Sequence, residues 1–78
     1  MASLEEKLKA YSNAWWSNTE IAIVTGYSYA EVSKIKQQIV KSGGSVIGHG
    51  QKVYRDAACK VLGIDYKKEI EILKMILG

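Results

Sequence analysis

Residues 17–42 read SNTEIAIVTGYSYAEVSKIKQQIVKS, and this stretch decides the fold. It contains two Ser-x-x-Glu capping boxes, which begin at Ser17 and at Ser28, and such boxes are typical of helix starts. Gly26 stands between them and provides the left-handed residue at which many helices end. The pattern therefore predicts a short helix that ends before Gly26 and a longer helix that runs from Ser28 to about Ser42.

The longer helix is amphipathic. Its apolar side chains recur at helical spacing and form one stripe, which we expect to face the core. The opposite side is polar and basic, and it contains no acid after Glu31. The stripe consists of Val32, Ile35, Ile39 and Val40, and the opposite side carries Ala30, Ser33, Lys34, Gln37 and Lys41.

Two short helices joined across a glycine, the second with a basic outer face, are typical of a helix-turn-helix. In such a motif a small residue is needed where the second helix crosses the first, and Ala22 meets this need. The alternative is an ordinary helical hairpin in a small bundle. The apolar side chains expected to fill the space between the two helices are Ile21, Tyr27, Val32 and Ile35.

The flanking segments complete a single domain over 1–78. Another capping box at Ser3 predicts a first helix over 4–11, followed by a loop. Residues 45–55 suit a short hairpin, hence a wing, or an irregular loop. Asp56 caps or begins a further helix, and Asp65 caps the last one. The predicted fold class is mainly α. It consists of a helix-turn-helix, which a short hairpin at 45–55 would make a winged one, and a C-terminal helix. Its parts are 1–16 (helix and loop), 17–42 (helix-turn-helix), 45–55 (wing or loop) and 56–78 (C-terminal helices).

Composition excludes several classes of protein. A chain of 78 residues with 47% hydrophobic and 24% charged residues has ordinary globular values. It has no apolar run near the ~20 residues of a membrane helix, so we expect no membrane partner. The single cysteine, Cys59, excludes an internal disulfide and suits a reducing cytoplasm. With one histidine beside it, we expect no metal site, and no cofactor is predicted. So few reactive groups argue against an enzyme and leave a small binding module.

Positive charge is concentrated in the middle of the chain. The whole chain has a net charge of +3, but residues 32–60 hold six basic side chains against one acid, Asp56, which gives this segment +5. Such a segment favours a polyanionic partner. An unevenly charged solvated surface is the alternative.

Short motifs within 17–65 give a resemblance to a known group. They are the Gly-Tyr-Ser at 26–28, the Ile-Lys-Gln-Gln-Ile-Val-Lys at 35–41, the Lys-Val-Tyr-Arg-Asp-Ala-Ala at 52–58 and the Leu-Gly-Ile-Asp at 62–65. The chain resembles the small helix-turn-helix, excisionase-like DNA-binding proteins of phages and integrative mobile elements of Gram-positive bacteria. Where those proteins usually have a proline after the valine, this chain has Tyr54. The resemblance implies an accessory role in excision, regulation or replication.

If the longer helix enters the DNA major groove, the side chains on its first half lie nearest to the bases. Gln37 could pair with adenine and Lys34 could reach guanine acceptors. Other basic residues would hold phosphates, and duplex DNA is favoured over a single strand. The predicted base contacts are Ser28, Tyr29, Ser33, Lys34 and Gln37, and the predicted phosphate contacts are Lys41, Lys52 and Arg55.

Four residues have two interpretations each. Trp15 and Trp16 could stack on unpaired bases. The pattern favours the other interpretation, in which at least one of them anchors the first helix to the core. His49 could touch DNA from the tip of a wing or lie in an exposed turn. Glu31 could read cytosine, although its capping box explains it more simply. Cys59 is best interpreted as a small buried hydrophobe.

The last helix, expected over 66–77, has more apolar residues than the first helix can cover. Part of it is therefore predicted to be a protein interface formed by Ile70, Leu73 and Leu77, in a homodimer or on a larger recombination or replication protein. The alternative is that the whole helix belongs to the monomer core. A second functional hypothesis follows from the interface: a small adaptor that docks on an enzyme such as a primase or polymerase, with single-stranded DNA binding as an additional activity.

Overall fold

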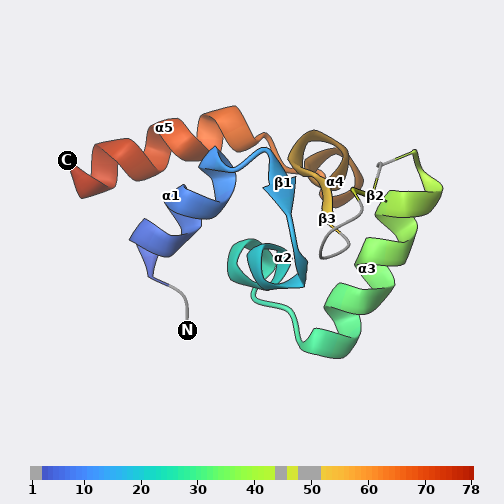
Figure 1. Cartoon of the computed structure of the whole chain (residues 1–78). Helices are drawn as coiled ribbons and strands as arrows, with labels where there is room; N and C mark the ends of the chain where they lie inside the picture. Colours follow the sequence, from blue (N-terminus) through green and yellow to red (C-terminus); the bar gives the residue numbers. More distant parts are fainter. Residues whose placement is uncertain (1–2, 44–45, 48–51) are drawn as a thin grey trace.

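We describe the fold from a computed structural model of the chain, in which residues 3–43, 46–47 and 52–78 are described. The architecture is mainly helical, with a small antiparallel sheet at its centre (Figure 1). In chain order the elements are α1 (Leu4–Ser12), β1 (Trp15–Trp16), α2 (Asn18–Thr25), α3 (Tyr29–Lys41), β2 (Val46–Ile47), β3 (Lys52–Tyr54), α4 (Arg55–Leu62) and α5 (Tyr66–Leu77).

The predicted helices are confirmed, and their ends have the predicted chemistry. The Ser3 and Ser28 side chains each accept a hydrogen bond from the backbone N–H three residues on. The Glu31 carboxylate accepts from the Ser28 hydroxyl at 3.0 Å, which confirms the capping interpretation of this acid. Gly26 ends α2 with φ 72°, in the left-handed region that disfavours residues with a Cβ.

Residues 52–54 and 46–47 pair as antiparallel strands, with Val46 opposite Val53, which confirms the hairpin expected within 45–55. The tip of this hairpin, with His49, lies outside the described residues. A third strand was not predicted: the loop expected over 12–16 contains β1, whose Trp15 pairs with Tyr54. The sheet order is β1-β3-β2, so β3 is central. Two residues are too short a pattern to predict a strand, and β1 forms because β3 offers it a partner.

The core lies between the sheet and the helices around it. Its fully buried side chains include Trp16, Ile21 and Val32, which come from β1, α2 and α3. The Trp16 indole Nε1–H donates to the Ala10 carbonyl at 2.7 Å, which satisfies its only polar atom. Trp16 therefore anchors the end of α1, as favoured from the sequence. Tyr27 was predicted to fill the space between α2 and α3, but it is exposed, because the turn after Gly26 leaves its side chain outside.

The start of α4 differs slightly from expectation, whereas α5 begins as predicted. α4 begins at Arg55, with Tyr54 as N-cap, so Asp56 lies in its first turn and does not cap it. Asp65 caps α5 as predicted, since its side chain accepts from the Lys68 N–H. In the part of the chain that the structure describes, no helix is both long and apolar enough to cross a membrane.

The molecule is elongated, with extents of 36 × 23 × 22 Å. α1 and α5 lie side by side and form one end, whereas α3 lies at the other end, beyond α2 and the sheet (Figure 1). This arrangement leaves the outer side of α3 remote from the α1–α5 pair.

Candidate nucleic-acid interface

The outer side of α3 is a polar and basic stripe. Its buried side is fixed by Val32 and Ile39, which are fully buried, so the side chains half a turn away must face solvent. Lys34, Gln37 and Lys41 are all exposed and follow one another along this outer side. We call these three residues, together with the exposed Ala30, the α3 stripe.

The first turn of α3 brings a large aromatic side chain to the same region. Tyr29 is 75% exposed, so most of its side chain is accessible to a ligand. Ser33 is half-buried at the edge of the stripe. Ser28 is less available than predicted, because its hydroxyl both donates to and accepts from Glu31.

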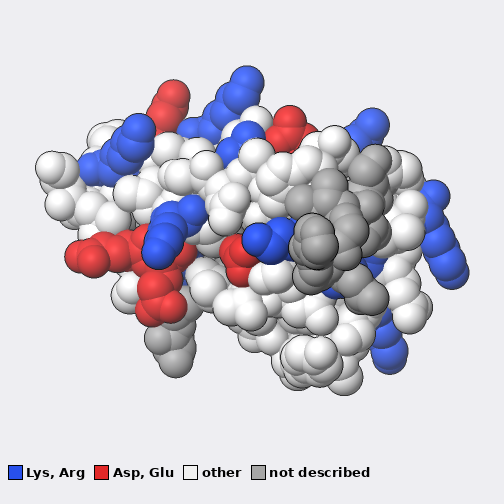
Figure 2. Space-filling view, viewed as in Figure 1, with Lys and Arg blue, Asp and Glu red and all other residues white. Residues whose placement is uncertain are grey.

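The visible acidic side chains avoid the end of the molecule that α3 forms. Figure 2 shows basic side chains over the whole view, several of them projecting from the right edge over α3, whereas the acidic side chains that are visible lie to the left and at the centre. Of the described residues, the acid in α3 is Glu31, at its first turn, and the last turn carries Lys41. Beyond its first turn, the outer side of α3 thus carries no acidic side chain of the helix itself. This side can therefore approach a polyanion without repulsion from acids of α3.

The predicted phosphate contacts are not equivalent. Lys52 is half-buried on β3 and its ammonium group has no ion pair among the described residues. The Arg55 guanidinium is instead committed to the fold. Its Nη1 donates to the Tyr11 carbonyl at 2.9 Å, its Nε lies 3.2 Å from Asp56, and its carbon lies 3.9 Å from the centre of the Tyr66 ring. Arg55 therefore links α1, α4 and α5, and its side chain is only 17% exposed.

The outer face of the sheet carries an aromatic pair that the sequence did not predict. Burial alternates along β1 and β3, so Trp16 and Val53 face the core while Trp15 and Tyr54 face outward. The Trp15 and Tyr54 rings are 3.9 Å apart between centroids and tilted by 31°, which makes them a stacked pair. Since a strand pairing brings these rings together, only knowledge of the register could have revealed the pair.

The predicted interface on α5 has to be moved to another side of that helix. Leu73 is 5% exposed and belongs to the core, and Ile70 packs against the core, where α5 lies on α1. Leu77 remains partly exposed at the helix end. The surplus apolar side chains lie on the outer face of α5 and are Ile72, Met75 and Ile76.

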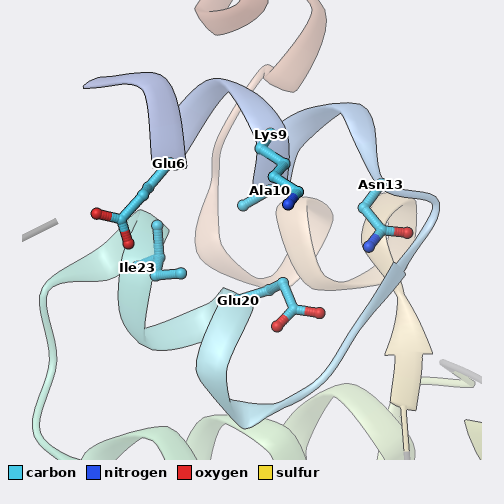
Figure 3. A pocket seen from close by; sticks show the side chains of 6 residues that line it. All are labelled: Glu6, Lys9, Ala10, Asn13, Glu20 and Ile23. Carbon is cyan, nitrogen blue, oxygen red and sulfur yellow. The ribbon is translucent and has the colours of Figure 1, made fainter. Parts of the chain in front are cut away.

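A hollow of about 340 Å³ lies between α1 and α2. Figure 3 shows the side chains around it, among them the carboxylates of Glu6 and Glu20. Both carboxylates are already used, because each accepts hydrogen bonds from the serine that begins its helix. Helix capping accounts for these acids, and the hollow offers no free catalytic pair.

The nucleophile and metal chemistry of the described residues is sparse. No group of three or more His, Cys, Asp or Glu side chains within 3–43, 46–47 and 52–78 could hold a metal ion. Cys59 is 2% exposed, and burial raises the pKa of its thiol to about 11. The thiol is therefore protonated at neutral pH and behaves as the small buried hydrophobe expected from the sequence.

No protein-family model, curated protein or solved structure matches the chain.

Proposed function

We propose that the protein binds duplex DNA through the α3 stripe and that α2, the turn at 26–28 and α3 act as a helix-turn-helix. The observation that carries the proposal is the stripe itself, in which two lysines and one glutamine face solvent along one side of a helix at the end of the molecule. An α-helix fits the major groove, where glutamine can pair with adenine and lysine can reach guanine.

Each side chain has a specific role in this proposal. Lys34 and Gln37 read bases, assisted by Tyr29 and Ser33, and Lys41 holds a phosphate at the far end of the stripe. Lys52 adds a second phosphate contact from β3, as the base of a wing. The accessory role in excision, regulation or replication of a mobile element is implied only by the sequence resemblance.

The test separates phosphate contacts from base contacts. Lys41→Ala should weaken binding to every duplex and reduce the slope of log K against log salt by about one. Gln37→Ala should cost about 1–3 kcal/mol on a selected site and much less on random DNA. Lys60→Ala, an exposed lysine on α4, is the matched control. Unchanged binding in Lys34→Ala, Gln37→Ala and Lys41→Ala together would refute the proposed surface.

A second candidate function rests on the outer face of α5. Met75 is 82% exposed and is joined on that face by Ile72 and Ile76, a cluster of apolar side chains that favours a protein partner. The partner is a second copy of the chain, or a larger recombination or replication protein on which the chain acts as an adaptor. Because α5 lies at the other end of the molecule from α3, both functions can operate together.

A further inference from the structure

The stacked Trp15–Tyr54 pair is placed on a surface that a ligand can reach. Trp15 is half-buried and Tyr54 is 43% exposed, on the face of the sheet opposite the core. Lys52 lies two residues before Tyr54 on β3, so its side chain leaves the strand on the same face. Two aromatic rings and one lysine side chain thus share a patch that the fold buries only in part. We call these three residues the sheet-face patch.

The core does not need this patch to be aromatic. Trp16 and Val53 already fill the buried side of the same two strands, and both are fully buried. Tyr54 remains 43% exposed, so part of the stacked pair is accessible to solvent. Such a surface can accept a further planar group in the same stack.

The charge of the patch selects among planar ligands. Lys52 gives the patch a positive charge, and its ammonium group has no ion pair among the described residues. A ligand that combines a flat ring with negative charge fits this surface, and an unpaired nucleotide has both. The bases of a duplex are stacked on one another, so they cannot offer a face to Tyr54.

We propose that the sheet-face patch binds unpaired nucleotides of a single-stranded nucleic acid, with the base stacked on the Trp15–Tyr54 pair and the phosphate held by Lys52. The site lies on β1 and β3 and shares Lys52, but no residue of the α3 stripe, with the proposed duplex surface. The α3 stripe would then hold a duplex and the Trp15–Tyr54 pair an unpaired strand, with Lys52 available to a phosphate of either.

The structure provides an internal reporter. Trp16 is fully buried, so a change in tryptophan fluorescence on adding a ligand to the whole chain reports Trp15. An eight-residue oligothymidylate should quench the fluorescence with saturation, and the matched oligouridylate shows whether DNA or RNA is preferred; quenching by either supports the site. Inorganic polyphosphate, which has charge but no base, should not quench. Equal quenching by polyphosphate, or quenching only by a proline-rich peptide, would overturn the proposal.

Variants test the stacking directly. Tyr54→Leu should weaken binding of the oligothymidylate about tenfold, whereas Tyr54→Phe, which keeps the ring, should retain it. Tyr27→Leu, which removes a ring of similar exposure (44%) from the turn between α2 and α3, is the matched control and should leave this binding unchanged. Wild-type affinity in Tyr54→Leu would overturn the proposal. Duplex binding measured in the same Tyr54→Leu protein separates the two sites, because it depends on α3 and should not change.

Discussion

Among single residues, Arg55 has a structural role that its charge alone did not predict. From the sequence it was one of the predicted phosphate contacts, but its guanidinium contacts Tyr11, Asp56 and Tyr66. Arg55→Gln should therefore lower the free energy of unfolding by about 1–3 kcal/mol, since a charged hydrogen bond and a cation–π contact are lost together. Urea denaturation measures this loss.

Lys52→Gln is the matched control for that prediction, because Lys52 has no ion pair among the described residues. We expect its stability to stay within about 0.5 kcal/mol of wild type. Equal stability of the Arg55 variant and the wild type would show that the guanidinium does not link the helices in solution.

Two buried ionisable side chains of the core, Cys59 and Tyr11, should make the free energy of unfolding fall at alkaline pH. Burial raises the pKa of Cys59 from 9.0 to about 11, and burial together with the Glu69 charge raises the pKa of Tyr11 from 10.0 to about 12. Both groups lose their proton more easily in the unfolded chain. Their contribution to stability is thus full below about pH 9 and is lost as pH rises from about 9 to 12. Urea denaturation at a series of pH values should show this fall.

Cys59→Ala identifies the cysteine's share of that pH dependence. The variant should keep the tyrosine-dependent fall and lose the part that begins near the ordinary thiol pKa. An identical pH profile in the variant and the wild type would mean that the Cys59 thiol is not buried as described.

At the scale of elements, the helices could be predicted and the sheet could only be predicted in part. Capping boxes and the apolar period of 32–40 mark helix starts and faces locally, so α1, α2, α3 and α5 follow from the sequence. β1 could not be predicted, because its pairing with β3 joins segments 39 residues apart at Trp15 and Tyr54. The same limit applies to the candidate sites: the α3 stripe follows from helical periodicity, whereas the Trp15–Tyr54 stack depends on strand register.

The turn between α2 and α3 gives a prediction at this scale. Gly26 has φ 72°, and a Cβ at that position would meet no neighbouring atom within 4 Å. Gly26→Ala should therefore destabilise the fold through backbone conformation alone, by about 1–2 kcal/mol. Gly26→Asn should cost less, because asparagine tolerates the left-handed region. Thermal unfolding followed by circular dichroism checks both, and equal losses for Ala and Asn would point to a steric cause instead.

At the scale of the whole molecule, the two ends have different surfaces. α3 presents a basic stripe, while the outer face of α5 presents Ile72, Met75 and Ile76. We expect the chain to self-associate through α5. Met75→Glu with Ile76→Glu should abolish association and leave a folded monomer, because both side chains are exposed. Leu73→Asp should instead unfold the domain, since it places a carboxylate in the core.

Sedimentation velocity with circular dichroism separates these outcomes. A wild-type chain that is monomeric at high concentration would contradict self-association and assign the outer face of α5 to a different protein. A folded Leu73→Asp monomer would contradict the packing of α5 against α1.

The central claim is that the α3 stripe is the surface that meets duplex DNA. The most direct measurement is nuclear magnetic resonance of the isotope-labelled chain titrated with a random-sequence duplex at low salt. The largest shift changes should fall on the backbone amides of 29–41 and on the side-chain amide of Gln37, with small changes over α1 and α5. Changes confined to α1 and α5, with α3 unaffected at saturating duplex, would contradict the claim.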